Sequence, residues 1–135
     1  MPIHLSERRD PDKAQLLQLY RANGWSAAEK PEALYRALAN SHALVSAWEN
    51  ERLLGLGNAI SDGHLVVYFP HLLIHPEHQQ RGIGRMIMDR MQEKYGHFHM
   101  QMLTADRKSV AFYQKMGFSR AGDTLPMWIY QGDEH

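Results

Sequence analysis

The chain has 135 residues, with 15 basic and 15 acidic side chains, nine histidines and no cysteine. This length suits one domain of ordinary size, so residues 1–135 are expected to form a single domain. The lack of cysteine excludes a disulfide framework, a cysteine-ligated zinc site and a thiol nucleophile. The formal net charge of zero argues against a broad nucleic-acid-binding face, which is normally basic.

The first residues lack the charged and apolar regions of a signal peptide, and no apolar run approaches the roughly 20 residues of a membrane span. The longest run lies near Leu65 to Phe69 and ends at Pro70. We therefore expect a cytoplasmic protein without a membrane or nucleic-acid partner.

The first part of the chain predicts one strand followed by two helices. Residues 3–7 can form a short strand. A helix is expected to begin with Asp10 as N-cap and Pro11 at its first position, and to end at Asn23. A second helix is expected over residues 31–40. The apolar face of the first helix carries Leu16, Leu19 and Tyr20 at helical spacing.

The middle of the chain changes to the two-residue period of strands. Residues 43–48 alternate, and residues 53–60 form a further predicted strand. Asp62 and Gly63 then give a strong hairpin signal. Residues 64–75 form a third long strand, in which Pro70 removes a ladder donor and predicts a bulge or an unpaired edge.

The last part predicts a helix over residues 82–94, a strand over 97–102, a short helix over 108–116, and two final strands over 118–121 and 127–130. The order is β-α-α-β-β-β-α-β-α-β-β. Hairpins in the middle and helical crossovers later favour an α/β (α+β) fold with a mixed sheet.

The segment over residues 72–85 carries the strongest chemical signal. An apolar strand leads into a polar loop, then into Gly82 and Gly84 and an amphipathic helix. Glycine lets the backbone approach a ligand closely, and the helix N-terminus offers free N–H groups, so the segment can bind a diphosphate. Arg81 and Arg85 add charge there. The alternative is an ordinary glycine turn at a helix start.

Two blocks in this region resemble the GNAT superfamily of acyl-CoA-dependent N-acyltransferases. Residues 79–84, Gln-Gln-Arg-Gly-Ile-Gly, match its Gln/Arg-x-x-Gly-x-Gly/Ala signature. Residues 112–118, Phe-Tyr-Gln-Lys-Met-Gly-Phe, match its Phe-Tyr-x-x-x-Gly-Phe segment about 30 residues later. The predicted element order also fits over nearly the whole chain.

The resemblance implies a mixed sheet of about six to seven strands, splayed between the fourth and fifth, with about four helices. Acetyl-CoA would lie in the resulting gap as cosubstrate. Its pantetheine arm would pair with the backbone of Leu73, Ile74 and His75, and a backbone N–H near Ile74 would polarise the thioester carbonyl. Its diphosphate would be held by Gln79, Gln80, Arg81, Gly82, Ile83, Gly84 and Arg85.

The same resemblance places Tyr113 where many members carry the tyrosine that protonates the departing thiolate. The alternative is that Tyr113 is a core residue of a short helix. Asp106 stands where many members have an asparagine that touches the cofactor, and an ionised aspartate cannot donate the same hydrogen bond. Ser109 occupies a position that is usually small.

The acceptor side is less defined by sequence. His71, whose side chain titrates near neutrality, and Tyr68 are candidate bases for the ammonium proton. His71 can instead be an exposed histidine beside Pro70. Trp25 and Tyr35 are candidate pocket residues in the region that covers the acceptor in this family, although a tryptophan at such a place is more commonly a core anchor.

We therefore expect an enzyme that transfers acetyl from acetyl-CoA to a primary amine of a small molecule by direct attack in a ternary complex. This chemistry needs no metal. The alternatives are a non-catalytic acyl-CoA-binding sensor and a protein N-acetyltransferase. The oligomeric state stays open between a monomer and a homodimer.

Overall fold

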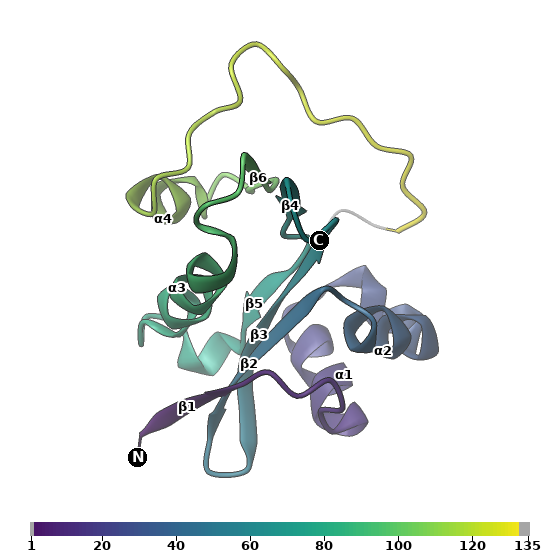
Figure 1. The fold of residues 1–135 in the computed structure, drawn as a ribbon. Coiled ribbons are helices and arrows are strands. Elements are labelled where there is room, and N and C mark those ends of the chain that lie inside the picture. Colours follow the sequence, from purple (N-terminus) through teal and green to yellow (C-terminus); the bar gives the residue numbers. More distant parts are fainter. Residues whose placement is uncertain (1, 133–135) are drawn as a thin grey trace.

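A strand forms in each region between residues 3 and 102 where one was expected, and together these regions build one mixed sheet of six strands (Figure 1). The strand expected over residues 97–102 is shorter than predicted and begins at Met100. The computed structural model describes residues 2–132. The strands are β1 (Ile3–Ser6), β2 (Ala43–Glu49), β3 (Arg52–Ser61), β4 (Val66–Tyr68), β5 (Leu72–Ile74) and β6 (Met100–Met102). The helices are α1 (Lys13–Ala22), α2 (Pro31–Ala39), α3 (Ile83–Tyr95) and α4 (Val110–Lys115), with 3₁₀ turns at Ser26–Glu29 and Pro76–His78. The expected α/β class with a mixed sheet is confirmed.

The alternating residues of β2 face two separate apolar cores. Ala43, Val45 and Ala47 pack in a core with α3, whereas Leu44 packs in a second core with α1 and α2. The sheet therefore lies between two helical layers, as Figure 1 shows.

Helix α1 begins two residues later than the sequence suggested. Its N-cap is Asp12, whose carboxylate accepts the N–H of Gln15 at 3.1 Å. Asp10 instead binds the Arg8 guanidinium through two contacts of 3.0 Å. The expectation of Asp10 as N-cap was wrong because this nearby cation engages its carboxylate.

The expected long strand over residues 64–75 is divided by a β-bulge into β4 and β5. Ile60 of β3 pairs with Tyr68, and Gly57 of β3 pairs with Leu72. Two residues of β3 thus oppose the three residues 69–71, which include Pro70. The bulge that the proline predicted is confirmed.

Asn58 is the buried side chain that holds this bulge. Its amide oxygen accepts the backbone N–H of His71 at 3.1 Å, and its amide nitrogen donates to Ser41 Oγ at 3.0 Å. Ser41 Oγ in turn donates to the carbonyl of Ala37 at the end of α2, at 2.9 Å. Asn58 therefore ties the point where the strand bends to the helical layer beneath it.

The bulge directs β5 away from β6. Strand β4 pairs in parallel with β6, and this ladder ends where the Phe69 N–H donates to the Met102 carbonyl at 3.0 Å. Strand β5 pairs with β3 alone. The sheet is therefore splayed beyond Phe69, where the resemblance places the gap between the two parallel strands.

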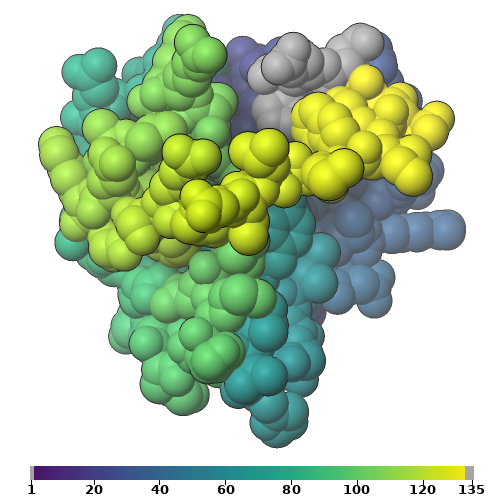
Figure 2. All heavy atoms as spheres, turned by 90° about the horizontal axis from the view of Figure 1, so that it is seen from above, coloured from purple at the N-terminus to yellow at the C-terminus, as the bar shows by residue number. Residues whose placement is uncertain are grey.

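The two final strands predicted over residues 118–121 and 127–130 do not form, and this expectation was wrong. Residues 119–132 are exposed and run across one end of the molecule from α4 toward α1 and α2 (Figures 1 and 2). Their period-two pattern has no neighbouring strand to pair with, and β-propensity alone does not make a strand. No helix within residues 2–132 is long and apolar enough to cross a membrane.

The role of Asn58 predicts the cost of removing its side chain. Asn58→Ala leaves the partly buried His71 N–H without its acceptor, so the free energy of unfolding should fall by about 1–3 kcal/mol in urea denaturation. The matched control is Asn40→Ala, which removes an exposed amide that donates to Arg36 at 2.8 Å. Equal losses in the two variants would contradict the anchoring role of Asn58.

Candidate active site

The outer edge of β5 presents backbone groups that the sheet does not use. In its ladder with β3, the His71 carbonyl accepts from Asn58 and the His75 N–H donates to Leu54, so the odd-numbered residues face β3. By alternation, the N–H and carbonyl groups of Leu72 and Ile74 face the gap. The Ile74 N–H has no hydrogen-bond acceptor within residues 2–132.

This geometry distinguishes the three residues that the sequence suggested for backbone pairing. The N–H of His75 is engaged by β3, and Leu73 lies directly opposite Leu56 in the same ladder. Of the three, Ile74 offers its backbone to the gap, and Leu72 does so two residues earlier.

The N-terminus of α3 offers a set of open N–H groups. Gly82 caps the helix in the left-handed region with φ of 77°, and the first helical bond runs from the Met86 N–H to the Gly82 carbonyl. In the part of the chain that the structure describes, the N–H groups of residues 82–85 meet no acceptor. A Cβ placed on Gly82 would have no atom within 4 Å, so the backbone is open to a ligand there.

Elements far apart in the sequence meet at Gly84. A Cβ built there would lie 3.4 Å from Phe112 Cζ of α4 and 3.9 Å from Leu72 Cδ2 of β5. The open helix N-terminus, the free strand edge and the helix that carries Tyr113 are therefore adjacent.

The charged and polar residues around the loop are more engaged than the sequence implied. Arg81 forms a bidentate pair with Glu49, with a shortest contact of 2.7 Å, and this guanidinium lowers the pKa of the Glu49 carboxyl. Arg85 pairs with Asp89 on α3 at 3.1 Å. Gln80 has a positive φ of 66°, and Gln79 Nε2 lies 3.5 Å from the Ile74 carbonyl.

Tyr113 of α4 is half-buried with its ring held by aromatic edges. The ring centroid lies 5.0 Å from that of Phe112 and 5.8 Å from that of Phe118. Burial, and to a smaller extent the charge of Asp106, raises the pKa of the Tyr113 phenol to about 12. The phenol is therefore protonated at neutral pH and can donate a hydrogen bond or a proton.

Asp106 and Ser109 bind each other at the start of α4. The Asp106 carboxylate accepts the N–H groups of Lys108 at 3.0 Å and Ser109 at 3.1 Å, and the Ser109 hydroxyl donates to it at 3.2 Å. This arrangement explains an aspartate at position 106, because a carboxylate caps the backbone before α4.

His71 lies in a cluster of rings rather than in solvent. Its Nδ1 is 2.7 Å from the hydroxyl of Tyr20, and its ring packs edge-to-face against Tyr20 and Trp25, with centroids 5.4 and 5.1 Å away. Tyr20 is fully buried, and burial raises the pKa of its phenol. The structure thus brings two sequence candidates, His71 and Trp25, together.

The other two acceptor-side candidates lie outside this ring cluster. Tyr68 projects from β4 with 39% of its surface exposed. Tyr35 lies on α2, where the Lys13 ammonium is 4.5 Å from its ring centroid.

The histidine-rich loop has local structural roles. His75 Nδ1 accepts the Glu77 N–H at 3.1 Å and so caps the 3₁₀ turn, and the His75 ring packs on His78. Burial lowers the pKa of His78, with smaller contributions from Arg52 and Arg81. Residues 2–132 contain no cluster of three histidine, aspartate or glutamate side chains arranged for a metal.

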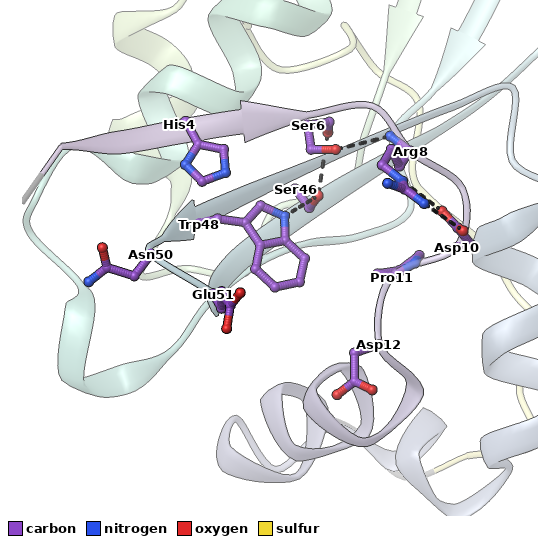
Figure 3. Close-up of a pocket in the computed structure, with 10 residues that line it drawn as sticks. All are labelled: His4, Ser6, Arg8, Asp10, Pro11, Asp12, Ser46, Trp48, Asn50 and Glu51. Carbon is purple, nitrogen blue, oxygen red and sulfur yellow. Dashed lines mark hydrogen bonds and ion pairs between the residues drawn. The ribbon is translucent and has the colours of Figure 1, made fainter.

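One surface hollow lies away from this site. A cavity of about 310 Å³ lies between β1, β2 and the start of α1, with Trp48 at its centre (Figure 3). Its rim residues are engaged with one another: Arg8 binds Asp10, and the Trp48 indole donates to Ser46 at 2.8 Å. The candidate site therefore rests on the open strand edge and helix end, not on this hollow.

Sequence reasoning missed Tyr20, Asn58 and Leu72. Tyr20 fell on the apolar face of a predicted helix, where its hydroxyl gave no separate signal. Asn58 lay inside a predicted strand. Which alternate residues of β5 turn their backbone away from β3, Leu72 among them, depends on the exact position of the bulge, and Pro70 indicates that position only approximately.

Comparisons with known proteins agree on one family. A family profile described as "Acetyltransferase (GNAT) domain" matches residues 10–126. The chain is 27% identical over 128 residues to the uncharacterized N-acetyltransferase ycf52 of Pyropia yezoensis, covering 90% of this chain and 72% of that protein. It is 28% identical over 99 residues to the peptidyl-lysine N-acetyltransferase YiaC of Escherichia coli K12, covering 68% and 64%.

Solved structures show the same fold. A GNAT-family acetyltransferase from Streptococcus pneumoniae TIGR4 superimposes with a TM-score of 0.82 at 27% identity, over 96% of this chain and 99% of that one. An aminoglycoside acetyltransferase from a soil metagenome, solved with sisomicin, has a TM-score of 0.66 at 15% identity, over 97% of both chains.

Proposed function

Because this chain belongs to the GNAT acetyltransferase family, we propose that it transfers an acetyl group from acetyl-CoA to a primary amine of a small molecule. We propose that it does so as a single domain in the cytoplasm. The observation that carries the proposal is the meeting at Gly84 of the open α3 N-terminus, the free edge of β5 and α4.

The residues present fit this donor. A diphosphate accepts hydrogen bonds, and residues 82–85 offer four N–H groups at the positive end of the α3 dipole. An extended pantetheine amide can pair with the backbone of Leu72 and Ile74 as a strand would. Arg85, whose partner Asp89 is exposed, can turn toward the phosphates, whereas Arg81 is held by Glu49.

In the transfer, the amine nitrogen bonds to the thioester carbonyl carbon while the carbon–sulfur bond breaks. The Ile74 N–H donates to the carbonyl oxygen as negative charge develops there. The Tyr113 phenol then gives its proton to the departing sulfur, and the proton that the attacking nitrogen loses as the amide forms returns the phenolate to the phenol. Burial raises the pKa of Tyr113, and the same burial would raise the pKa of the departing thiol. The proton affinities of the phenol and the thiolate therefore rise together.

An ammonium must lose a proton before it attacks, and we propose His71 as the group that takes it. For this, the free-base ring carries hydrogen on Nδ1 and donates it to the Tyr20 oxygen, leaving a lone pair on Nε2. When Tyr20 donates to Nδ1 instead, the ring presents Nε2–H and can only donate to the acceptor. In that case water, or Tyr68 through water, takes the proton.

A small acceptor is favoured over a protein side chain by the C-terminal segment. The Tyr130 hydroxyl lies 3.0 Å from Ser26 Oγ, directly after Trp25 in the chain. This contact holds the C-terminal segment beside the turn that follows Trp25, and we expect it to restrict the width of the acceptor side. YiaC, a peptidyl-lysine acetyltransferase, makes a lysine peptide the necessary comparison in a panel of small amines.

The open backbone at Gly82 allows a test of the proposed diphosphate site by Gly82→Ala. A methyl group there points into the space proposed for the diphosphate, so the dissociation constant for acetyl-CoA should rise about tenfold or more in calorimetry. Gly122→Ala is the matched control, because Gly122 also has a positive φ, of 60°, and open space around it. Equal acetyl-CoA affinity in both variants would remove the diphosphate from this loop.

The proton donor is tested with Tyr113→Phe. Its ring packing survives and only the hydroxyl is lost, so kcat should fall about 100-fold or more while acetyl-CoA affinity holds. Because the pKa of Tyr113 is about 12, kcat should not decline through loss of this proton over about pH 6 to 9. Tyr95→Phe is the comparison, because it removes a hydroxyl that is bonded to His42 outside the proposed site. Wild-type kcat in Tyr113→Phe, with chemistry rate-limiting, would make Tyr113 a structural residue.

The base is tested by pH profiles of kcat/KM with one amine throughout. With His71 as proton acceptor, kcat/KM rises with pH as the imidazole loses its proton. His71→Ala should remove this rising part of the profile and lower the rate about 100-fold. Tyr20→Phe should shift the rising part of the profile along the pH axis, because it removes the hydrogen bond between Tyr20 and His71 Nδ1. The exposed His97→Ala is the control. A His71→Ala profile identical to wild type would exclude His71 as the base.

No turnover with any amine, despite tight acetyl-CoA binding, would instead support the acyl-CoA sensor. Such a result separates the two functions, because both bind the donor and only the enzyme releases free thiol.

A further inference from the structure

The largest exposed apolar side chains of the molecule gather in one C-terminal segment. Residues 125–130, Leu-Pro-Met-Trp-Ile-Tyr, include four whose exposed fractions are 74% for Leu125, 94% for Met127, 68% for Trp128 and 96% for Ile129. Soluble proteins rarely expose contiguous apolar surface of this kind unless it binds something.

This segment has the geometry of a strand without a sheet. Trp128 and Tyr130, two residues apart, stack with centroids 4.4 Å apart and ring planes at 10°, so they share one side of an extended backbone. Met127 and Ile129 lie on the other side. After Pro126, every residue from 127 to 130 carries a backbone N–H, and none of them has a main-chain partner within residues 2–132.

The sheet has a matching open edge. Strand β6 ends the sheet and pairs with β4 alone. The Met100 N–H and the Met102 carbonyl face β4, so the N–H and carbonyl of Gln101 face outward. Met100 and Met102 are 41% and 38% exposed beside this edge. Such an edge is a template for another strand.

Residues 125–130 and the open edge of β6 lie at the same end of the molecule (Figure 1). The chain does not bring its own segment onto its own β6, because residues 119–132 cross toward α1 and Tyr130 binds Ser26. A surface that carries both an unpaired strand segment and an open sheet edge is self-complementary, as a two-fold interface requires.

We propose that residues 127–130 add as a strand to the β6 edge of a second copy of this chain, and that the reciprocal contact closes a symmetric dimer. Each copy then gains main-chain hydrogen bonds for Gln101 and covers Met127 and Ile129. This interface does not involve the proposed donor site at Ile74 and the start of α3, although Tyr130 of the same segment contacts Ser26 on the proposed acceptor side.

Sedimentation velocity at tens of micromolar tests the assembly. The protein should be a dimer, and Ile129→Lys should raise its dissociation constant by about tenfold or more, because it charges the buried side of the strand. Ala14→Lys adds the same charge on exposed α1 and should leave the dimer intact. A wild-type monomer, or equal dissociation in both variants, would overturn the proposal.

The absence of cysteine allows a direct test of which copy supplies the strand. Chains with Met100→Cys or Met102→Cys are mixed with tagged chains carrying Met127→Cys or Ile129→Cys, and oxidised. A disulfide between tagged and untagged chains, formed by at least one pair, supports exchange. Disulfides only within single chains that carry both changes would show that the segment returns to its own β6 and would contradict the proposal.

Discussion

The bulge at residues 69–71 is the constraint on which the site depends. Without it, β4 and β5 would form one strand in a single register with β3, and the backbone groups of Ile74 would face β3 instead of the gap. One extra residue lets β4 stay beside β6 while β5 follows β3. Asn58 stabilises this geometry by supplying a side-chain acceptor for the His71 N–H.

The same bend links the two halves of the proposed chemistry. His71 is the last residue of the bulge, and Ile74 lies three residues later on the free edge. The donor side thus uses backbone groups of β5 and α3, whereas the acceptor side uses rings from α1, the turn after it and the bulge. Charged side chains near the donor side mostly serve the fold: Arg81 binds Glu49 and Asp106 caps the approach to α4.

Much of this architecture could be predicted from sequence because its signals are local. Alternation located β2, the aspartate–glycine pair located the hairpin, and Pro70 located the bulge. The two glycine-containing blocks indicated the family. Ladder parity, the Tyr20 bond to His71 and the Asn58 anchor could not be predicted, because each depends on tertiary contacts between distant segments. The prediction of the final strands was wrong for a related reason. Residues 127–130 have the pattern of a strand, but the chain does not place them beside an open sheet edge with which they could pair.

In the function we propose, the Ile74 edge and the α3 N-terminus bind acetyl-CoA together. An amide NMR titration with acetyl-CoA tests it most directly. We expect large shifts and slower hydrogen exchange at Ile74 and at residues 82–85, with little change at Leu73 and His75, whose groups belong to the β3 ladder. Saturable binding that leaves the Ile74 amide unchanged would contradict it.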